Sequence, residues 1–326
     1  MIKDDAGGSP PALRTDRLGR RYGRVWGLRD CTLEVPTGAI AALVGPNGAG
    51  KTTLLEMIIG LLQPTEGQVS VLGETSHSPM TARLARVGYV AQDHPLYRDF
   101  SVADMFHLGR AMNPRWDQGL AQARMETLGI PLKRRVKGLS GGQRAQVSLT
   151  MALAKRAPLL VLDEPVSSLD PVARLEFMRE VMAAAAADSG LTVLISSHVV
   201  SELERLCDWL IILTGGQVHL AGPTDNLLAA HRLLTVPRAT SDAELPGLII
   251  HRTDSDRHSS ALVRTDPVRL AATDRPGWQA DSVSFEQLVM AYLQRPSNAT
   301  AQNSATQDDT ARATARPGPT TKAVSR

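Results

Sequence analysis

Residues 45–53 read Gly45-Pro46-Asn47-Gly48-Ala49-Gly50-Lys51-Thr52-Thr53, which fits the pattern G-x-x-x-x-G-K-[ST] without a gap. An apolar run, Ile40 to Val44, precedes this stretch, and another, Leu54 to Ile59, follows it. These flanks predict the strand and the helix between which such a loop lies. The glycines let successive backbone N–H groups point inward, and the helix adds the positive end of its dipole. The stretch therefore predicts a cradle for a polyphosphate.

Two side chains of this cradle have expected tasks. Lys51 is expected to reach the β- and γ-phosphates of a nucleotide, and the hydroxyl of Thr52 to coordinate Mg²⁺. The alternative is a chance match in a glycine-bearing loop, which the strand and helix flanks disfavour.

Length and composition exclude several classes of protein. A chain of 326 residues can form one large domain or a large and a small one, and its net charge of +3 does not by itself indicate a nucleic-acid partner. The longest apolar runs, Leu159 to Leu162 and Met182 to Ala187, are far shorter than the roughly 18 to 20 residues that cross a bilayer. Met1 to Ala12 lacks the apolar core of a signal peptide, so we expect the chain in the cytosol. Cys31 and Cys207, far apart in the chain, are typical of buried thiols in a reducing compartment.

An acidic pair follows the apolar run Leu159 to Leu162, at the end of a strand where α/β sheets carry their chemistry. Asp163 is the expected Mg²⁺ partner across from Thr52, and Glu164 is left to polarise a water molecule. The alternative role, a helix cap, is assigned to Asp170 instead, because the next helix starts only there.

Other polar residues occupy similar places. Gln92 follows the apolar run Val87 to Ala91, and His198 comes just after the run Thr192 to Ile195. A single histidine after a strand is more often a hydrogen-bonded loop residue than a catalytic one. Tyr22, upstream of the cradle, can stack on an adenine, although a half-buried strand residue is the commoner role.

The stretch Leu139-Ser140-Gly141-Gly142-Gln143 predicts a second anion-binding helix end. It directly precedes a helix, Arg144 to Lys155, whose apolar residues lie on nearly all sides, so this helix is expected to be buried. Upstream, a helical insert runs from about residue 93 to 137, and Ser101 can cap its first helix. Short strands are predicted at Leu18 to Tyr22 and Leu28 to Val35.

The predicted domain boundaries follow from these patterns. Residues 1–12 form a flexible N-terminus, 13–231 the main domain, 232–295 a small α+β appendage and 296–326 a tail. The appendage contains short strands and a helix Phe285 to Leu293, announced by Ser284 and Gln287 at capping-box spacing. The tail has almost nothing to bury, so disorder is expected.

With these motifs in this order, the chain resembles the ATP-binding subunit of an ABC transporter over about Leu13 to His231. The sequence Leu-Ser-Gly-Gly-Gln at 139–143 is the hallmark of that family. The resemblance implies an α/β fold, that of a P-loop NTPase of the ABC type with a helical subdomain, to which the appendage and the tail are added. It also implies hydrolysis of ATP to ADP and phosphate, coupled to transport across a membrane.

The resemblance further implies roles for single residues. Tyr22 stacks on adenine, Gln92 senses Mg²⁺ and water, Glu164 is the general base and His198 contacts the γ-phosphate. The implied metal ligands are Thr52, Gln92 and Asp163. The implied nucleotide-binding positions are Tyr22, Gly45, Pro46, Asn47, Gly48, Ala49, Gly50, Lys51, Thr52, Thr53, Gln92, Ser140, Gly141, Gly142, Gln143 and Asp170.

Partners are implied in the same way. Two such subunits, identical or different, pair head to tail, so that ATP lies between the cradle of one and the Ser140 to Gln143 stretch of the other, with Ser167 to Asp170 at the seam. The helical insert docks on a separate membrane permease, with Tyr97, Phe100 and Trp116 as candidate contacts. The subunit is then cytoplasmic and peripheral on the inner face of the membrane, and no nucleic acid is expected.

Competing readings stay open. The stretch Asn113 to Asp117 and the run Leu139 to Glu164 look more like ABC-2-type exporters of the antibiotic-efflux kind than like importers. A soluble ABC ATPase acting on nucleic acid or ribosomes is an alternative. Its coiled-coil kinds are disfavoured because only about ninety residues separate Lys51 from Ser140, and its ribosome-bound kinds because they usually carry two such domains in one chain, where this sequence shows one. A GTPase or nucleotide kinase is disfavoured by the 139–143 stretch and by Tyr22.

Overall fold

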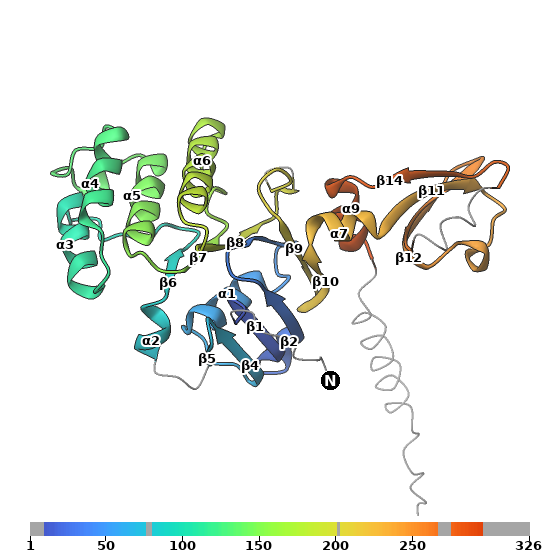
Figure 1. The fold of residues 1–326 in the computed structure, drawn as a ribbon, viewed down its shortest axis with the longest axis horizontal. Coiled ribbons are helices and arrows are strands. Elements are labelled where there is room, and N and C mark those ends of the chain that lie inside the picture. Colours follow the sequence, from blue (N-terminus) through green and yellow to red (C-terminus); the bar gives the residue numbers. More distant parts are fainter. Residues whose placement is uncertain (1–9, 76–79, 201–202, 267–274, 296–326) are drawn as a thin grey trace, which may run out of the picture.

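The computed structural model of the protein describes residues 10–75, 80–200, 203–266 and 275–295. Figure 1 shows an α/β core, a group of helices beside it and an appendage extending from the opposite side. Within these ranges no helix combines the length and the apolar character that crossing a membrane requires. Residues 1–9 of the predicted flexible N-terminus (1–12) and the predicted tail (296–326) lie outside the described residues.

The main sheet has the strand order β10-β9-β3-β8-β7-β6. Strands β3, β6, β7, β8 and β9 run parallel, and β10 is antiparallel to β9. Strands β7 and β8 are buried along their whole length, as their continuous apolar sequences predict. The strands are β3 (Ile40–Val44), β6 (Val87–Val90), β7 (Leu159–Asp163), β8 (Thr192–Ser197), β9 (Trp209–Thr214) and β10 (Gln217–Pro223).

A second, antiparallel sheet of order β2-β1-β4-β5 covers helix α1 (Lys51–Ile59) from the other side. Its strands β1 (Leu13–Tyr22) and β2 (Val25–Val35) are longer than predicted, because their pairing continues from Tyr22 opposite Val25 down to Leu13 opposite Val35. The remaining strands are β4 (Glu66–Val71) and β5 (Glu74–Thr75). Apolar side chains of α1 and of both sheets form one buried cluster, which fixes the start of α1 against β3.

The helical group contains α3 (Val102–Met112), α4 (Gln118–Thr127) and α5 (Gly141–Ala154) around a small apolar core of its own. Ser101 caps α3 in a capping box with Asp104, as its position predicts. Helix α5 contributes to this core and also to the core of the main sheet, so it belongs to both. Two further helices, α2 (Met80–Leu84) and α6 (Pro171–Ala187), flank the main sheet.

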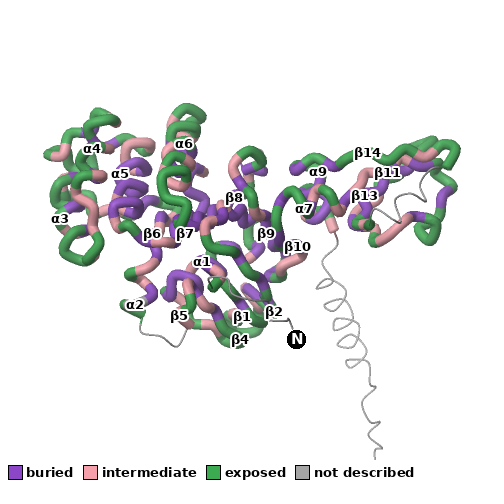
Figure 2. The backbone as a smooth tube through the Cα atoms, viewed as in Figure 1, coloured by how far each residue is buried: buried purple, intermediate pink, exposed green. Residues whose placement is uncertain are grey.

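The appendage follows helix α7 (Thr224–Ala229) and consists of an antiparallel sheet of order β12-β13-β11-β14 with helix α9 (Phe285–Leu293). Its strands are β11 (His231–Pro237), β12 (Leu248–Asp254), β13 (His258–Arg264) and β14 (Gln279–Ser282). The buried face of α9 joins the same apolar cluster as β9 of the core, and Figure 2 shows buried residues at this junction. The appendage is therefore rooted in the core by apolar packing.

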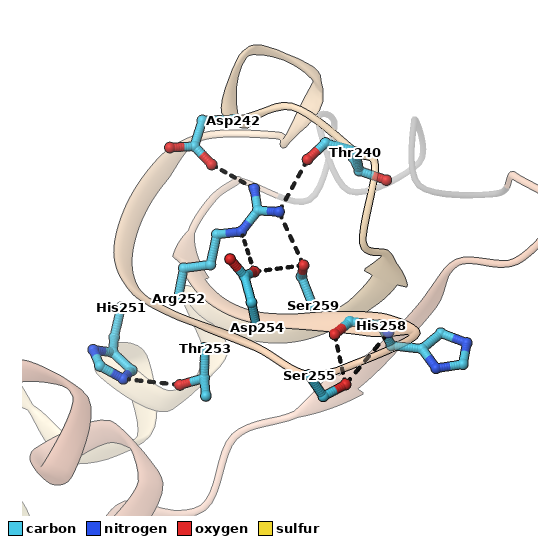
Figure 3. Close-up of polar contacts among 9 residues, drawn as sticks. All are labelled: Thr240, Asp242, His251, Arg252, Thr253, Asp254, Ser255, His258 and Ser259. Carbon is cyan, nitrogen blue, oxygen red and sulfur yellow. Dashed lines mark hydrogen bonds and ion pairs between the residues drawn. The ribbon is translucent and has the colours of Figure 1, made fainter.

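Away from the core, an arginine organises the loops of the appendage (Figure 3). Arg252 forms ion pairs with Asp242 and Asp254 and donates hydrogen bonds to Ser259 Oγ and to the carbonyl oxygen of Thr240. A guanidinium can serve this many acceptors because its five N–H donors lie in one plane. This network ties the segment of Thr240 and Asp242 to strands β12 and β13.

The junction between core and appendage contains a buried polar pair. His231 Nδ1 lies 2.6 Å from the carbonyl oxygen of Leu227, and the hydroxyl of Tyr292 lies 3.0 Å from His231 Nε2. Burial lowers the pKa of His231, so the ring is neutral near pH 7. A neutral ring that donates to the carbonyl through Nδ1 must accept through Nε2, and Tyr292 is the donor.

We expect Tyr292→Phe to lower the free energy of unfolding by about 1 to 3 kcal/mol, because it leaves a buried ring nitrogen without its donor. Urea or thermal denaturation measures this. The control is Tyr97→Phe, which removes the same hydroxyl group from a side chain that is 62% exposed to water. Equal stability of the two variants would contradict the assigned role.

Candidate functional site

The 45–53 loop joins β3 to α1 and is shaped by its glycines. Gly48 and Gly50 have φ values of 79° and 102°, in the region that favours glycine. A Cβ on Gly50 would lie 2.5 Å from the carbonyl oxygen of Gly27, so a larger residue would collide with strand β2. The loop borders a cavity of about 390 Å³, as expected of a cradle. The cavity is lined by Gly27, Asn47, Gly48, Ala49, Gly50, Lys51, Thr52, Thr53, Gln92, Glu164 and His198.

Lys51 is a buried cation, with 6% of its surface exposed. Its Nζ donates to the carbonyl oxygens of Gly45 at 2.7 Å and Pro46 at 3.3 Å, and lies 3.2 Å from Glu164 Oε1. These contacts offset the loss of hydration that burial of an ammonium group costs. The positive charge is thus fixed at the wall of the cavity, next to the carboxylate.

Glu164 adopts a backbone conformation that non-glycine residues seldom use, with φ of 44°. Its carboxylate lies between Lys51 and His198, whose Nδ1 is 2.6 Å from Oε2. Strain of this kind persists only where the surroundings impose it, and such positions cluster at active sites. Glu164 therefore has the geometry expected of a functional carboxylate.

Ser196, at the end of β8, supports the acidic pair and is not among the predicted site residues. Its hydroxyl donates to Asp163 Oδ1 at 2.7 Å and accepts from the backbone N–H of Glu164 at 2.8 Å. Asp163 is 2% exposed and lies behind the cavity wall. A signal was available, because Ser196 lies near the end of the strand that His198 follows. The sequence did not reveal that β8 is the neighbour of β7.

Mg²⁺ prefers oxygen ligands, and two of the predicted ligand residues line the cavity. Thr52 and Gln92 are both exposed and both line it. Asp163 is the third predicted ligand, set behind them and held by Ser196. The donor set is therefore chemically suited to Mg²⁺.

Tyr22 lies beside the cavity and does not line it. Its ring packs on Gly27, where an added Cβ would lie 2.8 Å from the ring, and the guanidinium of Arg20 lies 5.2 Å from the ring centroid. Tyr22 is 47% exposed, so its ring is accessible to a base at the mouth of the cavity. Gly27, which sequence reasoning missed, is what lets the tyrosine approach this closely.

The predicted residues Gly45, Pro46, Ser140 to Gln143 and Asp170 do not line this cavity. Ser140 caps α5, with its Oγ accepting from the N–H of Gln143 at 3.2 Å and its own N–H donating to Gln143 Oε1 at 3.1 Å. Asp170 caps α6, as predicted, by accepting from the N–H groups of Val172 and Ala173. Both residues are exposed and lie at helix N-termini.

Comparison with known proteins agrees with this geometry. A family model described as "ABC transporter" matches residues 28–167. The "Nod factor export ATP-binding protein I" of Ralstonia nicotianae is 32% identical over 89% of this chain and 92% of that relative. This chain belongs to the ATP-binding subunits of ABC transporters. The Ralstonia match is longer than residues 13–231, so the similarity of this ABC subunit to that relative extends beyond the predicted main domain.

Other comparisons agree on the family and the fold. The "Fe(3+) ions import ATP-binding protein FbpC" of Pseudomonas fluorescens is 36% identical over 65% of this chain and 61% of that relative. The solved "Structure of ATP binding subunit of ABC transporter" has a TM-score of 0.60 at 26% identity, over 66% of this chain and 91% of that one. This ABC subunit is an α/β P-loop NTPase that binds and hydrolyses ATP and powers a transporter, as the sequence predicts.

Lys51→Ala is expected to weaken ATP binding by the ABC subunit on the order of 100-fold, because charge-assisted hydrogen bonds to the phosphates are lost. Titration with a fluorescent ATP analogue measures the Kd. Lys137→Ala serves as control, since it removes an exposed ion pair with Asp99. A Kd near that of the unaltered protein would sink the cradle assignment.

Proposed function

We propose that this subunit hydrolyses ATP in the cavity of the 45–53 loop, with Glu164 as the general base. The observation that carries the proposal is that Lys51, Glu164 and His198 meet at one wall of that cavity. Glu164 takes a proton from the water that attacks the γ-phosphate. His198 orients Glu164 through Nδ1 and has its second ring nitrogen left for the γ-phosphate.

The ion pair between Lys51 and Glu164 has a place in this mechanism. A triphosphate carries more negative charge than one carboxylate, so it attracts Lys51 Nζ more strongly. As Lys51 turns to the phosphates, the Glu164 oxygen that it contacts is released for the attacking water. Binding of substrate thereby frees the carboxylate that acts as the base.

Thr52, Gln92 and Asp163 would hold Mg²⁺. Bound there, the ion would neutralise charge on the phosphates and orient them. Asp163 suits this role because Ser196 fixes one carboxylate oxygen and leaves the other available.

We assign the Ser140 to Gln143 stretch to the ATP bound by a second subunit, of the same or another sequence. It does not line the cavity of its own subunit, and a Cβ added at Gly141 would have no described neighbour within 4 Å. A helix N-terminus with exposed N–H groups binds phosphate. Head-to-tail pairing would then enclose each ATP between two subunits, with Asp170 near the seam.

The permease partner is assigned to an apolar groove of about 420 Å³ between the core and the helical group. Leu61, Tyr97 and Met112 line it and are 60%, 62% and 72% exposed. Exposed apolar side chains gathered in a groove mark an interaction site. Phe100, 40% exposed, lies 5.1 Å from the Tyr97 ring. Trp116 was expected with them, but it is half-buried against Phe106 and belongs to the subdomain core.

We propose export as the direction of transport and the cytoplasmic face of a membrane as the location. The Ralstonia relative, which matches nearly the whole chain, bears a name that states export. The import relative matches a smaller share. We assign the groove to docking of the permease and the cavity to ATP. The choice of the transported molecule is therefore assigned to the permease.

Glu164→Gln is expected to leave ATP binding intact and to lower the hydrolysis rate by about 10² to 10⁴-fold, the usual contribution of a positioned base. Phosphate release by the purified subunit with its transporter partners measures the rate. Glu176→Gln, an exposed carboxylate on α6, is the control. Hydrolysis within a few-fold of the unaltered rate would overturn the assignment of Glu164.

Leu61→Asp, Tyr97→Asp and Met112→Asp should each abolish co-purification with a membrane permease while ATP binding stays unchanged. A charge placed in the groove must be dehydrated on docking. Leu248→Asp is the control, since Leu248 is 51% exposed on the appendage. Trp116→Asp should instead lower the melting temperature. Normal permease capture by the three groove variants would show that the partner binds elsewhere.

A further inference from the structure

Arg124 of α4 joins three helices and is not explained by the site described above. Its Nε donates to Thr150 Oγ1 at 3.1 Å and its Nη2 to Gln146 Oε1 at 3.3 Å, both on α5. Its Nη1 forms an ion pair with Glu180 of α6. The Arg124 side chain is 14% exposed and that of Glu180 33%, so the pair is largely shielded from water.

Arg124 has polar partners on α5 and α6 and a cavity beside it. The apolar core of the helical group lies on another side of α4, around Ala121 and Met125. Next to the ion pair is a cavity of about 130 Å³, lined by Ala123, Arg124, Thr127, Leu128 and Glu180. Apolar side chains of α5 and α6 belong to one buried cluster, against which Leu120 of α4 also packs, and the Arg124–Glu180 contact adds an ion pair between α4 and α6.

The ion pair lies well behind the helix ends that face a second subunit. Gln146 and Thr150 come 6 and 10 residues after Ser140, and Glu180 comes 10 residues after Asp170. At 1.5 Å per residue, the contact is roughly 10 to 15 Å behind both N-termini. At the front, α5 and α6 approach so closely that a Cβ on Gly142 would lie 3.1 Å from that of Ala173.

Apolar packing is non-directional, whereas hydrogen bonds and ion pairs between fixed groups specify a geometry. The close approach of Gly142 to Ala173 restrains the N-terminal ends of α5 and α6, and Arg124 adds a directional contact farther back. Figure 1 shows α4, α5 and α6 standing in a row. Without the Arg124–Glu180 contact, α5 keeps its apolar packing but loses this directional link to α6, so the Ser140 to Gln143 stretch can shift relative to Glu164.

We propose that Arg124 is a positioning residue, which holds α5 at a fixed angle to α6 so that the Ser140 to Gln143 stretch meets the ATP of a second subunit. This inference rests on the head-to-tail pairing proposed above. Arg124 does not touch the nucleotide, so its effect is on the assembly of the paired site. Binding of ATP to the cradle of a single subunit is independent of it.

The test uses the full chain carrying Glu164→Gln, in which ATP is bound and not consumed. Sedimentation velocity with ATP and Mg²⁺ measures the dimer dissociation constant. We expect Arg124→Gln to raise that constant on the order of tenfold, as typical couplings between contacting groups predict. The Kd of the monomer for a fluorescent ATP analogue should change less than about twofold.

Two comparisons separate positioning from general destabilisation. Glu180→Gln should weaken pairing as Arg124→Gln does, and the double variant should be no worse than either, because one contact is removed in each case. Arg156→Gln is the matched control, since it breaks an ion pair with Asp117 in the same helical group without touching α6. It should pair normally.

A further readout uses the chain with Glu164 restored. The specific ATPase activity of Arg124→Gln should be low in dilute solution and recover as protein concentration rises, which a misfolded variant would not show. Unchanged pairing in Arg124→Gln, or additive losses in the double variant, would overturn the inference while leaving the paired site intact. Absence of ATP-dependent pairing in the Glu164→Gln chain itself would overturn the pairing proposal and this inference with it.

Discussion

Parallel pairing of β3, β8, β7 and β6 is the constraint on which the site depends. In this register Val44 lies beside Ser197, Ser196 beside Asp163, and Leu162 beside Val90. The carboxyl ends of the strands therefore meet at one edge, and the residues that follow them are brought together although they are far apart in the chain. The cradle, Gln92, Glu164 and His198 face one cavity for this reason.

Charges at this edge are buried but compensated. Lys51 has two carbonyl oxygens and a carboxylate as partners, and the acidic pair is held by the hydroxyl of Ser196 and by His198. Hydrogen bonds of this kind fix side chains before substrate arrives, which lowers the cost of reorganisation during the reaction. The backbone conformation of Glu164 is energetically unfavourable, and the surrounding strand ends impose it, so that the carboxylate faces the cavity.

The two additions to the core are attached in different ways. The appendage is joined through an apolar cluster shared by α9 and β9, with a buried histidine–tyrosine pair beside it, so we expect it to move with the core. The helical group shares α5 and its apolar packing with the core, and α4 adds a polar contact to α6 beside a cavity. This junction therefore combines apolar packing with a directional contact, in the part proposed to face the permease.

The sequence by itself determined the fold class, the cradle and the strand-end residues Gln92, Glu164 and His198, because short motifs with fixed spacing and apolar periodicity are local properties. It also determined the caps Ser101 and Asp170, each of which acts within three residues of itself. Only the tertiary structure decided that Ser196 supports Asp163, that Trp116 is half-buried, and that Arg124 meets Glu180. These contacts join residues from different elements through the order of strands and the packing of helices, which no local pattern encodes.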